Sequence, residues 1–173
     1  MSRSYLVVLG HREAIGWVLR EQRMAFPSTP RAEVAALGEG DRLFLYATRG
    51  AWLNPTRDRG RVIGLARAQG AVRRFGDPIE IAQRIFVSGC DLEVDGLVPY
   101  PCGLELQPLV GQLDAFPKPE AWSIYLRRAL LRLSDADADL LGARVRPLVT
   151  SREEALGSYP WARPGSLLRN VAG

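Results

Sequence analysis

Arginines and a tryptophan gather between two apolar runs near the middle of the chain. The runs, Leu43–Ala47 and Val62–Ala66, are bounded by Gly, Asp, Asn and Pro. They predict two buried strands joined by a loop far longer than a hairpin needs. The loop contains Trp52, the single acid Asp58, and the arginines Arg49, Arg57, Arg59 and Arg61. Guanidinium groups pair with phosphate and an indole stacks on flat rings, so nucleic acid is the first hypothesis for what this loop binds.

The basic residues are concentrated in this part of the chain. The 173 residues include 23 basic and 19 acidic ones, a formal net charge of only +4. Between residues 49 and 74, however, a single acid accompanies seven arginines, namely Arg49, Arg57, Arg59, Arg61, Arg67, Arg73 and Arg74. All of these except Arg67 are expected phosphate ligands, which would give affinity without sequence information and a strong dependence on salt. The alternatives are a solvated surface with scattered ion pairs and a GC-rich genome that favours arginine.

A pocket that reads a base needs aromatic faces for stacking and polar groups for the base edge. The candidates are the aromatic residues Trp17, Tyr46, Trp52 and Trp122 and the polar residues Ser28, Thr48, Asn54 and His11. Trp17, Tyr46 and Trp122 are expected among apolar neighbours, so packing in the core is their alternative role. Trp52 lies in a polar loop, where packing explains an exposed indole less readily.

The residue types that commonly bind metals or catalyse reactions do not occur in a recognisable motif in this sequence. Cys90 and Cys102 have no second cysteine pair and no nearby histidine, which is typical of reduced structural thiols rather than a zinc site. The acids of Asp135–Asp139 are explained by the electrostatics of a helix start. His11 is the only histidine and lacks a recognisable catalytic partner. We therefore expect no metal, no cofactor and no catalysis.

The order of apolar runs and breaks along the rest of the chain predicts one α+β domain, a small barrel or strongly curved sheet with helices at its rim. Besides the two central strands, strands are expected at Ser4–Leu9, Ile85–Val94 and Leu104–Leu109, with a break at Asp77-Pro78. Helices are expected at Arg12–Gln22, at Arg31–Leu37 with Thr29 as cap, at Pro119–Arg128 and after the N-cap Ser134, while Leu130–Leu133 is either a helix continuation or a last strand. We expect residues 1–145 to form the domain and residues 146–173 a tail packed on it or extending from it.

No run approaches the roughly 18 apolar residues of a membrane span, and no signal peptide is visible, so a cytoplasmic protein is expected. 

Four segments stand in a characteristic order along the chain: REAIGWVLREQRMAF, the Gly-Asp-apolar-Tyr strand GDRLFLY, the apolar-Gly-apolar-Ala strand RVIGLARA, and AWSIYLRRALLRLSDADADLL. With the first strand, they cover Ser4 to about Leu141 and resemble the EVE domain of the PUA-like superfamily. The resemblance implies a barrel of five or six strands with peripheral helices, and a pocket for one flipped or modified base near the start of the first helix and the strand-to-strand loop. The chain departs from the family pattern in its longer Trp52-Leu-Asn-Pro-Thr loop and in lacking evident Lys and Gln positions after the first helix.

Residues and resemblance together predict a non-catalytic protein that binds DNA or RNA through a modified or flipped base, as a monomer or homodimer. One alternative is an ASCH-like hydrolase acting on RNA or modified nucleosides, although the chain offers only Lys118 and no GxKxxExR-like run. The other is a module that binds a small ligand or a protein partner through Trp52. Binding of the latter kind would be insensitive to salt.

Overall fold

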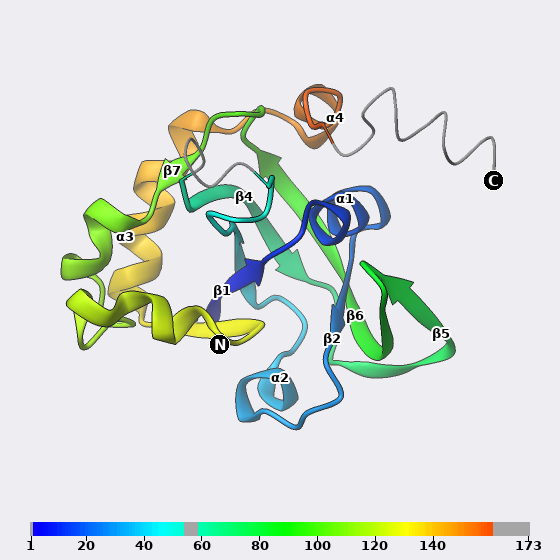
Figure 1. Cartoon of the computed structure of the whole chain (residues 1–173). Helices are drawn as coiled ribbons and strands as arrows, with labels where there is room; N and C mark the ends of the chain where they lie inside the picture. The colour runs from blue at the N-terminus through cyan, green and yellow to red at the C-terminus, as the bar shows by residue number, and fades with distance from the viewer. Residues whose placement is uncertain (1, 54–58, 161–173) are drawn as a thin grey trace.

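A computed structural model describes residues 2–53 and 59–160, which contain eight strands and a set of short helices (Figure 1). The strands are β1 (Ser4–Leu9), β2 (Arg23–Phe26), β3 (Arg42–Ala47), β4 (Arg61–Ala68), β5 (Arg73–Ile81), β6 (Arg84–Leu97), β7 (Leu104–Glu105) and β8 (Leu130–Leu133). The α-helices are α1 (Arg12–Glu21), α2 (Ala32–Ala36), α3 (Asp135–Val145) and α4 (Arg152–Leu156). The 3₁₀ helices are η1 (Gln107–Gln112), η2 (Pro119–Leu126) and η3 (Arg146–Leu148). None of the helices described is long and apolar enough to cross a membrane.

The strands form one mixed sheet that curls into a half-barrel. Six of them follow the order β2-β6-β4-β3-β1-β8, while β5 pairs with β6 and β7 pairs with β4. Only β1 and β3 run parallel; the other paired strands are antiparallel. The register shifts at Leu45/Tyr46 and at Leu65/Ala66, and such irregularities bend a sheet. With helices at its edges, this sheet confirms the predicted α+β fold.

Both faces of the central strands are buried, because side chains alternate between the faces of a strand. Tyr5 and Leu45 belong to a core cluster that includes the apolar side of α1. Leu6 and Phe44 belong to a second cluster that includes α3 and the 3₁₀ segments. In Figure 1, α1 and α3 accordingly lie on opposite sides of the sheet. Burial on both faces explains why these strands are continuous apolar runs rather than alternating ones.

The Gly40-Asp41 pair before β3 connects the start of β3 to the start of β1. Gly40 has a φ of 85°, which favours glycine. Asp41 is buried, and its carboxylate accepts hydrogen bonds from the amides of Arg3 at 2.8 Å and Gly38 at 2.9 Å. This carboxylate therefore holds the parallel pair β1 and β3 at their shared start.

The strands expected around Ser4–Leu9, Leu43–Ala47, Val62–Ala66 and Ile85–Val94 are confirmed, and Leu130–Leu133 is a strand, β8. The strand expected at Leu104–Leu109 is wrong beyond Glu105, because the chain turns there into the 3₁₀ helix η1 with Pro108 in its first turn. Strands β2 and β5 were not expected. β5 continues through Asp77-Pro78 because, of the strands described, it pairs only with β6, and its register with β6 shifts between Arg74 and Ile79.

The helices follow the predictions with two corrections. Thr29 is not a cap: α2 begins at Ala32, and its N-cap residue is Arg31, whose side chain makes no capping bond. The segment expected as a helix at Pro119–Arg128 is the 3₁₀ helix η2, which is kinked at Ala121. Ser134 is confirmed as an N-cap, since its hydroxyl accepts from the amide of Asp137 at 3.1 Å.

The residues that follow α3 pack against the sheet and α1. Thr150 forms an isolated bridge with Leu97, and the guanidinium of Arg152 donates to the carbonyls of Leu19 at 2.7 Å and Arg20 at 2.8 Å. These two carbonyls belong to the last turn of α1, whose carbonyls have no partner within the helix. The Arg152 side chain thus caps the C-terminal end of α1.

Candidate nucleic-acid interface

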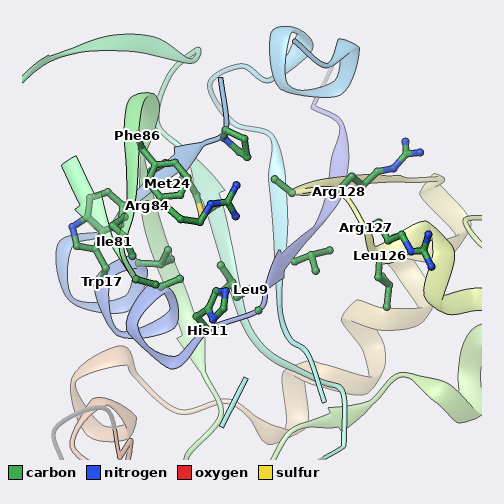
Figure 2. Close-up of a pocket in the computed structure, with 18 residues that line it drawn as sticks. Leu9, His11, Trp17, Met24, Ile81, Arg84, Phe86, Leu126, Arg127 and Arg128 are labelled. Atoms are coloured by element: carbon green, nitrogen blue, oxygen red, sulfur yellow. The ribbon is translucent and has the colours of Figure 1, made fainter. Parts of the chain in front are cut away.

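A cavity of about 320 Å³ opens where β1 ends and α1 begins, and we call it the α1 cavity. Its walls come from β1, α1, β2, the β5–β6 hairpin and the segment that follows η2. The side chains labelled in Figure 2 are Leu9, His11, Trp17, Met24, Ile81, Arg84, Phe86, Leu126, Arg127 and Arg128. Figure 2 shows the α1 and β6 residues on one side, Leu126 to Arg128 on the other, and Arg84 extending into the space between.

The inner wall of the α1 cavity combines aromatic rings with cations. Arg84 and Phe86 are two residues apart on β6, so their side chains share a face, and the Arg84 guanidinium lies 5.7 Å from the Phe86 ring centroid. The guanidinium carbon of Arg23 lies 5.6 Å from the centroid of the Trp17 ring on α1. Of the described residues that line the cavity, none is a carboxylate. This composition suits a flat uncharged ring attached to an anionic group.

Two further features lie at the rim, the start of α1 and an arginine held by an ion pair. Gly10, His11 and Ala14 line the cavity, so the N-terminal end of α1 faces it, and the His11 side chain makes no capping hydrogen bond. On the opposite wall, Arg128 forms an ion pair at 3.6 Å with Glu33 of α2. Glu33 Oε1 is buried and makes no hydrogen bond within the part of the chain that the structure describes. The pair therefore fixes Arg128 beside the rim without bringing the carboxylate into the cavity lining.

A larger cavity of about 750 Å³ adjoins the first, and we call it the Tyr46 cavity. Its lining comes from the ends of β3 and β4, from β7 and η1, and from η2. The lining residues are Tyr46, Thr48, Arg49, Gly50, Arg59, Gly60, Glu105, Gln107, Trp122, Ser123 and Leu126. Leu126 lines both cavities, so the two lie next to each other.

Seven of the predicted site residues line one or the other of these two cavities. His11 and Trp17 line the α1 cavity. The Tyr46 cavity brings together Tyr46, Thr48, Trp122, Arg49 and Arg59. Ser28 is exposed and follows Pro27 of the α1 cavity. Asn54 and Arg57 lie outside the described residues.

Trp52 is not the exposed indole that its polar neighbours suggested. Only 9% of it is exposed, and it belongs to the core cluster that packs on α1. Its ring centroid lies 5.1 Å from that of Tyr100 and 5.8 Å from that of Tyr159. The two tyrosines that cover Trp52 are about 50 and 100 residues further along the chain, so local sequence could not reveal the packing. This correction removes the simplest reason for placing a docking site at Trp52.

The arginine cluster is partly neutralised by acids from neighbouring strands. Arg61 pairs with Glu105 at 3.7 Å, and Arg73 pairs with Asp91 at 3.1 Å. Arg67 pairs with Asp95 at 2.9 Å. Arg74 is exposed on β5, a strand whose two adjacent arginines line neither cavity. Of the six arginines of this cluster that the structure describes, three are therefore paired with acids, and two, Arg49 and Arg59, line the Tyr46 cavity.

Sequence reasoning missed the β5–β6 hairpin and the three side chains it contributes, Ile81, Arg84 and Phe86. Its turn residues, Ala82 and Gln83, both have positive φ although neither is glycine, asparagine or aspartate. The usual signal for a two-residue hairpin is therefore absent. The signal that remained was the spacing of Arg84 and Phe86, which are two residues apart at the start of an expected strand and therefore lie on one face of it.

Burial raises the pKa values of three groups and keeps them protonated at neutral pH. It raises the pKa of Tyr46 to about 12 and that of the Cys90 thiol to about 11, in the latter case with help from the charge of Asp91. Burial also raises the pKa of Tyr159, whose hydroxyl donates to the carbonyl of Val98. The two cysteines are unpaired, and no group of three or more potential metal ligands occurs among the described residues. Tyr46 is therefore a hydrogen-bond donor in its cavity rather than an anion.

No protein-family model matches the sequence, and no curated protein sequence matches it either. Solved structures do match. A hypothetical protein from Leishmania major is 12% identical with a TM-score of 0.53, and the match covers 89% of this chain and 96% of that one. A protein from Pseudomonas syringae is 13% identical with a TM-score of 0.54, over 82% and 99% of the two chains.

The third structure is human THYN1, an EVE-domain protein, in complex with DNA that contains 5-methylcytosine. It is 12% identical with a TM-score of 0.52, over 83% of this chain and 97% of that one. The chain has an EVE-like fold. At these identities the similarity concerns the fold alone. The EVE-like fold agrees with the curled sheet, the peripheral helices and the element order described above.

Proposed function

We propose that this protein binds DNA or RNA by holding one base, modified or flipped out of its stack, in the α1 cavity. The observation that carries the proposal is the cavity lining: Trp17 and Phe86 supply aromatic faces and Arg84 a cation, with no carboxylate among the described lining residues. Proteins that take a base out of a stack hold it between aromatic or apolar side chains and contact its polar edge. The binding is not coupled to a reaction in this proposal.

The size and polarity of the α1 cavity support this occupant. Its volume of about 320 Å³ lies at the small end of ligand pockets, which span roughly 300–1,000 Å³. Apolar and aromatic groups fill most of its inner wall, and stacking on such groups is worth about 1–3 kcal/mol per base. Arg84 and the start of α1 line the same cavity, and we expect them to contact the sugar and phosphate of an inserted nucleotide.

The EVE-like fold adds support, since THYN1, which shares the fold, is seen in complex with DNA that contains 5-methylcytosine. That structure makes methylated DNA the first probe to use. Unmodified DNA and RNA of the same sequence belong in the same experiment, because the lining residues of the α1 cavity do not by themselves separate these classes.

The test is a titration of labelled single-stranded and duplex oligonucleotides, plain and with 5-methylcytosine, followed by fluorescence anisotropy at roughly 50 mM and 200 mM salt. We expect Trp17→Ala to weaken binding by about 1–3 kcal/mol, the value of one stacked base. Arg84→Ala should weaken binding and flatten its salt dependence. Arg144→Ala is the matched control, because it removes the same charge from an exposed position on α3, across the sheet. Absence of binding to every oligonucleotide would contradict the proposal.

A further inference from the structure

Tyr46 is a buried residue that lines a cavity. Tyr46 is only 1% exposed, and it lines the Tyr46 cavity. Within residues 2–53 and 59–160 no hydrogen bond to the Tyr46 hydroxyl occurs, whereas the hydroxyl of Tyr159 donates to the carbonyl of Val98. A phenol hydroxyl that lines a cavity and has no partner in the described protein can donate to a ligand acceptor there.

The chain is built closely around this hydroxyl. A Cβ atom at Gly60 would lie 1.8 Å from Tyr46 Oη and 2.7 Å from Cζ. Any side chain at position 60 would therefore push the Tyr46 ring out of place. Because residue 60 is glycine, the backbone lies against the phenol end and leaves the hydroxyl at the cavity wall.

The rest of the lining favours a nucleotide over a neutral metabolite. Trp122 offers an aromatic face, and Thr48 and Gln107 offer polar groups. Arg49 and Arg59 line the same cavity and are exposed. The one carboxylate in the described lining, Glu105, already pairs with Arg61. A phenol donor and exposed cations in one cavity suit the polar edge of a base and its phosphate.

The two cavities share the Leu126 side chain, so a single strand can reach both. We propose that the Tyr46 cavity is a second nucleotide subsite, which reads the base next to the one held in the α1 cavity. The Tyr46 hydroxyl donates to an acceptor on the edge of that neighbouring base, and Arg49 and Arg59 bind the phosphate that leaves the rim. This inference rests on the proposed function, and it adds sequence preference at one adjacent position.

The experiment compares short oligonucleotides whose central base is constant and whose neighbours are varied on each side in turn. Wild-type protein should prefer some bases over others on one side by roughly 3- to 10-fold, the effect of one hydrogen bond. Tyr46→Phe should lose that preference and bind the preferred oligonucleotide correspondingly more weakly. An abasic analogue at the neighbouring position should bind wild type and Tyr46→Phe equally.

The controls separate this inference from the proposed function. Tyr46→Phe removes a hydroxyl without a partner, so its thermal unfolding should match wild type. Arg49→Ala is a second variant, for which the slope of log affinity against log salt should fall by about one unit. If oligonucleotides bind in a Trp17-dependent manner but neighbouring bases and Tyr46→Phe make no difference, the second subsite is refuted and the proposed function stands. If no oligonucleotide binds, the proposed function fails. Binding of a mononucleotide that depends on Tyr46 but not on Trp17 would refute the claim that one nucleic-acid strand occupies both cavities.

Discussion

Replacing Asp137 with alanine should destabilise the protein and loosen one wall of the Tyr46 cavity. Asp137 is 1% exposed, in the first turn of α3. Its two carboxylate oxygens accept from the amides of Asp114 at 2.7 Å and Ala115 at 2.9 Å. The Ser134 hydroxyl donates to the Asp114 carboxylate at 2.8 Å, so the start of α3 and this loop hold each other.

The magnitude follows from these two bonds. Each hydrogen bond to a charged group is worth about 1.5–3 kcal/mol, so loss of the two in Asp137→Ala should cost about 3–6 kcal/mol of unfolding free energy. At about 2–4 °C per kcal/mol for a chain of this size, Tm should fall by roughly 6–24 °C. The loop leads to Phe116, whose ring centroid lies 6.3 Å from that of Trp122 in the cavity lining. The variant should therefore also bind oligonucleotides more weakly at the Tyr46 cavity.

Calorimetry and urea unfolding measure the loss, with Asp135→Ala as the matched control. Asp135 is exposed in the same helical turn, so its removal should cost only the interaction with the helix dipole, about 0.3–1 kcal/mol. Equal destabilisation by the two substitutions would refute the reasoning, because it would mean that the two buried amide bonds contribute nothing beyond helix electrostatics.

Two further predictions concern residues outside this loop. Gly60→Ala should displace the Tyr46 ring, lowering both Tm and oligonucleotide affinity, whereas Gly76→Ala, with nothing within 4 Å of its Cβ position, should change Tm little in the same thermal scan. Cys90 has a folded pKa raised from 9.0 to about 11, so the unfolded chain releases its proton first and stability should fall between about pH 9 and 11, by at most about 1.4 kcal/mol per pH unit. Urea unfolding of wild type and Cys90→Ala across that range should show a shallower fall for the variant; parallel curves would contradict the assignment.

The parts of the fold that sequence predicted best are those where one physical signal dominates. β1 and β3 are buried on both faces, so their apolar runs leave little ambiguity. Ser134 has the residue type and position of an N-cap, and its bond to the Asp137 amide confirms it. In contrast, β5 was obscured by Asp77-Pro78, which only the edge position of the strand makes tolerable.

The candidate site depended on contacts between distant segments, which the sequence could not show. Trp52 is covered by Tyr100 and Tyr159, and acids from β6 and β7 neutralise arginines that looked like an open cationic patch. The resemblance to the EVE domain implied a base pocket near the start of the first helix; the α1 cavity lies there, and its use for a base stays a prediction. Arg84 reaches that cavity only because of a hairpin whose turn carries no usual turn residue.

Photo-crosslinking tests most directly where the bound base lies. An oligonucleotide that binds in the titrations is prepared with a photoreactive base at the recognised position, irradiated in complex with the protein, and the linked peptides are identified by mass spectrometry. We predict crosslinks to the lining of the α1 cavity, at Trp17 or Phe86, that disappear when excess unlabelled oligonucleotide is added. Crosslinks confined to β5, around Arg73 and Arg74, would contradict the account, because they would show that nucleic acid binds an exposed strand rather than the cavity.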